Sequence, residues 1–262
     1  MRVVVDLGYG FSRAAMGIVE YLGNRDGHAR PVLTPRSRIP WIAELETDAG
    51  AIATEYRTLI EAIAPANSTA INPLSVGIDG AWSLMPLIDR AGPYPWLARC
   101  AVTARALARI PRLRAADFAV LAPQSHIHPH VGHNWGVMRA HLALIVPARP
   151  ATCELRFPDD DLTVAWTVGV GFAFDDTRRH EAQNLAETER VVLLIEFDRE
   201  LPPGLAALNA VSQWLYRWHP VQRGVRRRIL VTDTSAPTAR AGVGRLISTV
   251  RRTRERPSDG RQ

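Results

Sequence analysis

The spacing of apolar residues changes along the chain and predicts two kinds of structure. In the first third it is helical, and it predicts an amphipathic helix near residues 50–64. A second helix is predicted over 98–109, ending before Pro111. The stretch from Pro65 to Pro95 contains several Gly and Pro residues, which is typical of a loop. The apolar positions of the first helix are Ile52, Tyr56, Leu59, Ile60 and Ile63.

From residue 117 onward, short runs of β-branched and apolar residues alternate with turn signals, as in an all-β sandwich or barrel. After Pro202 the helical spacing returns. We therefore expect one structural domain in three parts: a helical and loop region over 1–115, a β core over 116–200, and a helix with a basic tail over 201–262. The predicted strands are 117–122, 136–146, 152–157, 162–166, 170–175 and 190–197.

The composition is that of an ordinary globular protein, with 47% hydrophobic and 22% charged residues. No apolar run approaches the ~20 residues that cross a bilayer. The N-terminal run of three valines is too short for a secretory signal. We therefore expect a cytoplasmic protein with no membrane partner. Cys100 and Cys153 form no CxxC pair, which excludes a disulfide framework and a thiolate zinc site.

The formal net charge is +6, and all 32 basic residues are arginine. Arginines concentrate between Arg223 and Arg254, and the ending RRTRERPSDGRQ is typical of a solvated tail. A nucleic-acid-binding arm is the alternative interpretation, but no aromatic residues interleave with these charges and no binding motif accompanies them. We therefore do not expect nucleic acid as the partner. The arginine excess suits an anionic small-molecule substrate.

Histidines provide the candidate chemistry. Side chains alternate along a strand, so Arg139, His141, Ala143 and Ile145 share one face of the predicted strand, opposite a wholly aliphatic face. His141 and Arg139 then point into a cavity of the barrel or sandwich. His180 follows the strand that ends at residue 175. A metal site is one interpretation, and polar residues on a surface loop are the other. Five of the eight histidines cluster: His126, His128, His130, His133 and His141.

A cupin metal site is a competing interpretation of the cluster. Cupins pair an HxH motif with a glutamate a few residues later. Here neither His126 with His128 nor His128 with His130 is followed by one, and the next glutamate is Glu154.

Four ordered motifs carry a resemblance to a known family. They are Ile110-Pro-Arg-Leu-Arg with Asp117–Leu121 and His128-Pro-His130; Arg139–Pro147; Trp166–Asp176 followed by His180-Glu; and Arg190 at the start of an apolar strand. Over roughly residues 80–200 the chain resembles the aspartyl/asparaginyl β-hydroxylase family of iron- and 2-oxoglutarate-dependent oxygenases.

The resemblance implies a double-stranded β-helix, a cupin-like jelly roll, with flanking helices. It implies Fe(II) held by His141 and His180 as the metal-binding and catalytic residues, with O2 as co-substrate. Arg190 matches the arginine that binds 2-oxoglutarate, because a guanidinium suits a carboxylate. Arg156 is a candidate second anion contact, and the candidate substrate contacts are His130, Asn134 and Arg139.

The resemblance leaves the third iron ligand open. The usual triad reads His-x-Asp/Glu with a distant His, but the residue two positions after His141 is Ala143, which cannot bind a metal. Hydroxylases of the resembled family that lack this carboxylate remain active, whereas in related halogenases chloride fills the position. Asp175 or Asp176 is a further candidate ligand.

We expect hydroxylation of an unactivated C–H bond in a small polar substrate: an amino acid or an amino-acid-derived, even carrier-bound, biosynthetic intermediate. A halogenase is the alternative enzyme. A metal- or nucleic-acid-binding protein that keeps only the β core is the alternative outside enzymes.

Overall fold

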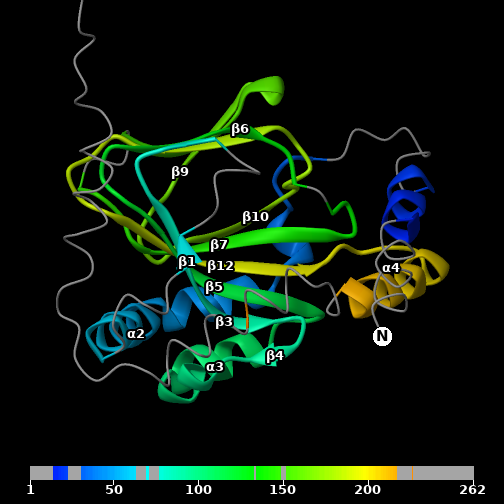
Figure 1. Cartoon of the computed structure of the whole chain (residues 1–262), viewed down its shortest axis with the longest axis horizontal. Helices are drawn as coiled ribbons and strands as arrows, with labels where there is room; N and C mark the ends of the chain where they lie inside the picture. Colours follow the sequence, from blue (N-terminus) through cyan, green and yellow to red (C-terminus); the bar gives the residue numbers. More distant parts are fainter. Residues whose placement is uncertain are drawn as a thin grey trace, which may run out of the picture.

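Two antiparallel β sheets face one another at the centre of the molecule (Figure 1). The computed structural model describes residues 14–22, 31–62, 69–70, 77–132, 134–148, 152–216 and 226. Within these residues the larger sheet has the strand order β1-β3-β5-β12-β7-β10, with β4 paired to β3, and the smaller sheet has the order β2-β6-β11-β8-β9. From β5 onward the chain passes back and forth between the two sheets, which makes the fold a double-stranded β-helix, or jelly roll.

The larger sheet contains β1 (Thr69–Ala70), β3 (Trp82–Asp89), β4 (Gly92–Pro93), β5 (Leu113–Leu121), β7 (Val137–Ile145), β10 (Gly171–Phe174) and β12 (Arg190–Asp198). The smaller sheet contains β2 (Ile78–Asp79), β6 (Ser125–His130), β8 (Cys153–Phe157), β9 (Leu162–Ala165) and β11 (His180–Asn184).

Helices cover the outer face of the larger sheet (Figure 1). The apolar stripe of α2 packs on this face together with α3, because a helix with one apolar side must bury it against another element. The last described helix, α4, lies beside the sheets at the end of β12 (Figure 1). The helical elements are residues 14–22, η1 (Arg36–Arg38), α2 (Trp41–Ala62), η3 (Pro95–Arg99), α3 (Ala101–Ala108), η5 (Pro158–Asp160) and α4 (Pro203–Tyr216).

Alternation along the strands of the larger sheet divides the core in two. On β12, Leu193 and Ile195 belong to the cluster beneath the helices, whereas Val192 and Leu194 belong to the cluster between the sheets. Arg190 has the same parity as Val192, so it also faces the space between the sheets. Polar residues at these inner positions are therefore candidates for a site.

The structure confirms the six predicted strands, which correspond to β5, β7, β8, β9, β10 and β12. It also contains β6 and β11, which the pattern of apolar residues did not predict. The prediction of a loop from Pro65 to Pro95 is wrong, because this stretch contains β3, which pairs with β5 along most of its length. The β core thus includes residues that were expected in the N-terminal helical region of 1–115.

The two predicted helices of the first third are present, although α2 begins earlier, at Trp41, and η3 and α3 together cover the second. The predicted C-terminal helix is α4. Residues 63–64, His133 and the basic tail, apart from Arg226, lie outside the described residues. None of the helices in the described part of the chain combines the length and apolar character needed to span a bilayer.

Candidate metal centre

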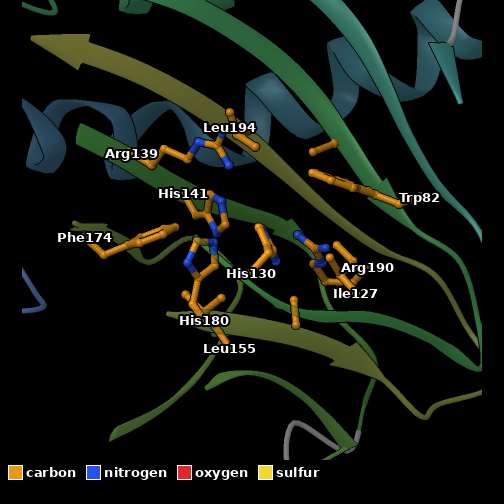
Figure 2. A pocket seen from close by; sticks show the side chains of 12 residues that line it. Trp82, Ile127, His130, Arg139, His141, Leu155, Phe174, His180, Arg190 and Leu194 are labelled. Atoms are coloured by element: carbon orange, nitrogen blue, oxygen red, sulfur yellow. The ribbon is translucent and has the colours of Figure 1, made fainter. Parts of the chain in front are cut away.

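Three histidines and an arginine converge on one pocket between the sheets (Figure 2). His130 comes from the end of β6, His141 from β7, His180 from the start of β11 and Arg190 from the start of β12. Two strands are thus contributed by each sheet. Most of the remaining lining is apolar: Trp82, Ala119, Ile127, Leu155, Phe174, Ala182 and Leu194, with Arg139 as a second arginine.

His130 and His180 form a matched pair. They are directly opposite in the β6–β11 ladder, and their ring centroids are 4.2 Å apart. Each Nδ1 lies 2.8 Å from a backbone carbonyl, of His128 and of Arg178 respectively. Because a carbonyl only accepts, each Nδ1 carries the donated hydrogen. Burial and the neighbouring His130 lower the pKa of His180 to about 3, so its ring is neutral.

A β-bulge turns His130 into the pocket. Two steps along β11, from His180 to Ala182, correspond to three steps along β6, from His130 to Ile127. The additional residue interrupts the alternation at Pro129, which is a position where proline is tolerated in a sheet. With regular alternation His130 would share the outer face of β6 with His128. Bulges of this kind commonly re-aim a side chain next to a functional site.

His141 has a different hydrogen-bond partner. Its Nδ1 accepts from the indole Nε1–H of Trp166 at 3.3 Å. Burial, and then the charge of Arg190, hold the pKa of His141 well below its usual value, so the ring is neutral. A neutral ring whose Nδ1 accepts carries its hydrogen on Nε2, which makes Nε2 a donor.

Arg190 is a buried cation that forms no ion pair with any described residue. Only 2% of the residue is exposed, and its guanidinium lies 4.5 Å from the centroid of the Trp166 ring. Its Nε has no hydrogen-bond partner, and no carboxylate among the described residues pairs with it. Burial lowers the pKa of Arg190 to about 10. An unpaired charge in the interior costs several kcal/mol, so the position favours an anionic ligand.

Asp176 lies where a side chain at position 132 would project. Gly132 donates its backbone N–H to the Asp176 carbonyl at 2.7 Å, and a Cβ at Gly132 would overlap the Asp176 carboxylate. That carboxylate pairs with Arg139 Nε at 3.1 Å, and its Oδ1 is buried without a hydrogen-bond partner. Burial raises the pKa of Asp176 to about 6, although Arg139 opposes the rise.

The neighbouring acid has a structural role. Asp175 pairs with Arg199 at 2.6 Å and accepts a hydrogen bond from the Thr177 hydroxyl at 2.6 Å. These contacts fix the turn that leads into β11, so Asp175 does not extend into the pocket.

Two residues predicted for the site lie elsewhere. Arg156 is exposed on the outer face of β8 and pairs with Glu154 of the same strand, because the inward position is taken by Leu155. Its assignment as an anion contact is therefore corrected. Asn134 caps a turn, its Oδ1 accepting from the Gly136 N–H at 3.1 Å, and it does not line the pocket.

The fold brings the other predicted site residues together in the pocket. Arg139, His141, His180 and Arg190 line the pocket, as does His130, which was expected only as a substrate contact. Sequence reasoning missed the part played by Trp166, although this residue opens one of the motifs. An isolated Trp in a predicted strand is usually core, and only its contacts with His141 and Arg190 reveal more.

A family model described as aspartyl/asparaginyl β-hydroxylase matches residues 46–200. Among curated proteins, an ornithine lipid ester-linked acyl 2-hydroxylase from Rhizobium tropici is 29% identical over 175 residues, which are 65% of this chain and 62% of that protein. The aspartyl/asparaginyl β-hydroxylase of Homo sapiens is 29% identical over 87 residues, or 33% of this chain and 11% of that protein. The chain therefore spans less than two thirds of either relative.

Solved structures give more distant matches. A prolyl-4-hydroxylase from Pseudomonas putida has 20% identity and a TM-score of 0.41, covering 60% of this chain and 88% of that one. HygX from Streptomyces hygroscopicus, solved with nickel and 2-oxoglutarate, has 14% identity and a TM-score of 0.39, covering 58% of this chain and 80% of that one.

Proposed function

Because the chain belongs to the aspartyl/asparaginyl β-hydroxylase family, we propose that it is a hydroxylase dependent on Fe(II), 2-oxoglutarate and O2. The observation that carries the proposal is Arg190, a buried guanidinium that pairs with no carboxylate among the described residues, in the same pocket as two histidines whose Nδ1 atoms donate to backbone carbonyls. The pocket thus offers neutral nitrogen donors for a metal and a cation for a carboxylate.

The proposed iron ligands are His130 and His180. They are opposite one another on paired strands, and both use Nδ1 for a backbone hydrogen bond, an arrangement that orients a ligating imidazole. For His141, predicted from sequence as a ligand, we propose the role of a hydrogen-bond donor, because its Nδ1 accepts from Trp166 and its Nε2 then carries the hydrogen. The residue two positions after the first ligand is then Gly132 in place of Ala143.

The proposed site for 2-oxoglutarate is the side of the pocket formed by His141 and Arg190. Arg190 supplies the positive charge, and the Nε2–H of His141 supplies a neutral donor. Trp166 holds both, since it contacts the guanidinium with its ring and His141 with its N–H. A carboxylate bound here removes the energetic penalty of the unpaired cation.

When bound, iron with 2-oxoglutarate and O2 supplies the oxidising power that replaces an unactivated C–H hydrogen by hydroxyl. The protein's part is to position the reactants and to exclude water. Apolar side chains such as Ile127, Leu155 and Leu194 line the pocket and keep it dry. The carboxylate of Asp176 offers a hydrogen-bond acceptor beside Gly132.

Hydroxylation is favoured over halogenation by the charge of Asp176. A halogenase needs space for a halide at the position where the third protein ligand is missing. The electrostatic potential at that position must also not repel an anion. Here the Asp176 carboxylate already occupies the space next to Gly132, and above pH 6 it is ionised. This negative charge, although paired with Arg139, disfavours a second anion beside it. The check is the product mass with and without chloride, where a chlorinated product would contradict the proposal.

The proposed substrate is amino-acid-derived. The names of the two relatives share this chemistry, one acting on an ornithine lipid and the other on aspartyl or asparaginyl residues. Succinate formation with free amino acids, an aminoacyl carrier, a peptide and an ornithine lipid would rank these forms. If none of them stimulates succinate formation above the substrate-free rate, the substrate class is wrong.

The test of the site is anaerobic titration of single variants with Fe(II) and then 2-oxoglutarate, followed by the visible charge-transfer band. We expect His130→Ala and His180→Ala to lower iron affinity by at least about 100-fold, because even loss of a second-shell partner costs 10–100-fold. His141→Ala is expected to keep iron but to bind 2-oxoglutarate at least about 10-fold more weakly.

A matched control is His126→Ala, a histidine of the same strand whose side chain faces away from the pocket; it should give the same charge-transfer band as the unchanged protein does. Loss of iron in His141→Ala together with retention in His130→Ala would restore the sequence-based assignment.

A further inference from the structure

A second histidine cluster lies on the outer face of the smaller sheet, on the opposite side from the pocket. His126 and His128 of β6 flank Ile127, whose side chain lines the pocket, so their rings project outward. Asp79 of β2 is the direct ladder partner of His126. In Figure 1, β6 belongs to the sheet away from α2 and α3, and no helix of the described residues covers this face.

The three side chains present ligand atoms to one another. One such atom from each of Asp79, His126 and His128 lies within 4.8 Å of the other two. Asp79 Oδ2 is 2.9 Å from His128 Nε2, in a hydrogen bond whose hydrogen a metal ion would replace, and the centroids of the two imidazole rings are 5.0 Å apart at an interplanar angle of 31°. Donor atoms at these separations can share one small cation with modest side-chain rotation.

Glu181 of β11 orients one of the rings. Its Oε2 is 2.7 Å from His126 Nε2. An ionised carboxylate only accepts, so Nε2 of His126 carries the hydrogen and Nδ1 keeps a lone pair. A histidine that donates its other ring N–H to a carboxylate is the usual outer-shell arrangement of zinc ligands.

We infer that Asp79, His126 and His128 form a binding site for a divalent metal ion of the zinc class, with Glu181 as the outer-shell partner of His126. Two imidazoles and a carboxylate suit Zn²⁺, and water completes the coordination. The side chains of His126 and His128 are 33% and 45% exposed, which gives the ion an open path from solvent.

The position gives the ion a structural effect. Zinc bound here links β2 to β6 and, through Glu181, to β11. The inner faces of β6 and β11 carry His130 and His180, so the outer ion stabilises the two strands that hold these histidines in register. Binding to the folded state alone raises the melting temperature.

The test isolates the outer site in the full chain. In the variant His130→Ala/His180→Ala, which lacks both inner donors, equilibrium dialysis should find one tightly bound Zn²⁺ per chain. Adding His128→Ala should weaken that binding by more than about 100-fold, since a coordinating atom is lost. Zn²⁺ should raise the melting temperature before this change and not after it.

Two further variants keep the test decisive. Thr163→Ala, an exposed change on the same face in β9, two strands from β11, should leave zinc affinity unchanged. Asp79→Asn changes a side chain that is 76% exposed, so it leaves the fold intact and should reduce the unaltered protein from two Zn²⁺ ions to one. The inference is overturned if the double variant binds no zinc, or if neither His128→Ala nor Asp79→Asn weakens binding.

Discussion

The buried guanidinium of Arg190 couples stability to ligand binding at the scale of one residue. Replacing it with methionine keeps most of its volume and removes a charge that no carboxylate of the described chain balances. We expect Arg190→Met to raise the free energy of unfolding of the ligand-free protein by roughly 1–3 kcal/mol. The same change should weaken 2-oxoglutarate binding by about 2–5 kcal/mol, because the carboxylate loses its partner.

Denaturant unfolding and 2-oxoglutarate titration of the same variant measure the two effects. Arg156→Met is the matched control, since Arg156 is exposed on the outer face and should change neither quantity. A variant at Arg190 that is destabilised and still binds 2-oxoglutarate normally would refute the role of Arg190.

Gly132 is a position where steric contact limits substitution. A methyl group at this position would meet the Asp176 carboxylate, so we expect Gly132→Ala to destabilise the protein by about 1–3 kcal/mol. Adding Asp176→Ala should relieve part of the cost, which a double-mutant cycle would show. Gly204→Ala, with no atom within 4 Å of its added Cβ, should be neutral or stabilising. Additive effects at positions 132 and 176 would argue against the contact.

At the scale of elements, the strands that carry the histidine pair are the ones without an apolar pattern. Strand β6 reads Ser-His-Ile-His-Pro-His, and β11 reads His-Glu-Ala-Gln-Asn. Apart from Ile127, their inner positions hold polar or small residues, so periodicity of hydrophobic residues could not reveal these strands. Strands β7 and β12 are long and apolar, and they were recognised.

One helix caps another in the layer beneath the larger sheet. The Cys100 side chain at the N-cap of α3 makes no capping bond. Instead Glu55 of α2 accepts the backbone N–H groups of Val102 and Thr103 at 2.8 and 2.9 Å, and also the Thr103 hydroxyl at 2.7 Å.

We expect Glu55→Ala to lower the free energy of unfolding by about 1–2 kcal/mol, because the first N–H groups of α3 lose their acceptor. Chemical denaturation measures the change. Glu61→Ala, on the exposed side of the same helix, should have no effect. Equal stability of the two variants would show that the contact between α2 and α3 contributes nothing.

At the scale of the whole molecule, buried charged residues on the inner faces of β5, β7 and β12 form a network around Arg139. Arg139 contacts Asp176 and Glu196, and Glu196 also pairs with Arg90 at 3.0 Å. Asp117 faces the same group from β5. Burial first, and then Glu196, raises the pKa of Asp117 to about 7, while Arg139 and Arg90 oppose the rise.

This raised pKa gives the fold a pH dependence with a definite sign. The folded state holds a proton on Asp117 that the unfolded chain releases near pH 4, so the contribution to stability is present below pH 4 and is lost as the pH rises to 7. Asp117→Asn removes the effect. We expect the variant to be more stable than the unchanged protein at pH 8 by at least about 1 kcal/mol, and the difference to shrink toward pH 4. Melting temperatures across this range measure it, and a constant difference would contradict the assignment.

How much of the fold and of the site could be predicted from the sequence depended on the kind of residue. The apolar strands, the helices and the inward face of His141 followed from the local spacing of apolar residues, and Arg190 followed from its match to a motif of the resembled family. The outward face of Arg156 also follows from alternation, once the register of β8 is known. Local alternation could not place His130, because regular alternation would set it on the outer face with His128 and the bulge reverses this.

The sequence by itself determined that the chain forms a β core with helices before and after it, and that a histidine- and arginine-containing site lies inside, because side-chain period and burial are local properties of a strand. Only the tertiary structure decided which histidines meet. That depends on a bulge at Pro129 that reverses one side chain, and on pairing between β6 and β11, strands about 50 residues apart in the chain. Such pairing is fixed by packing of the whole barrel, and no short segment encodes it.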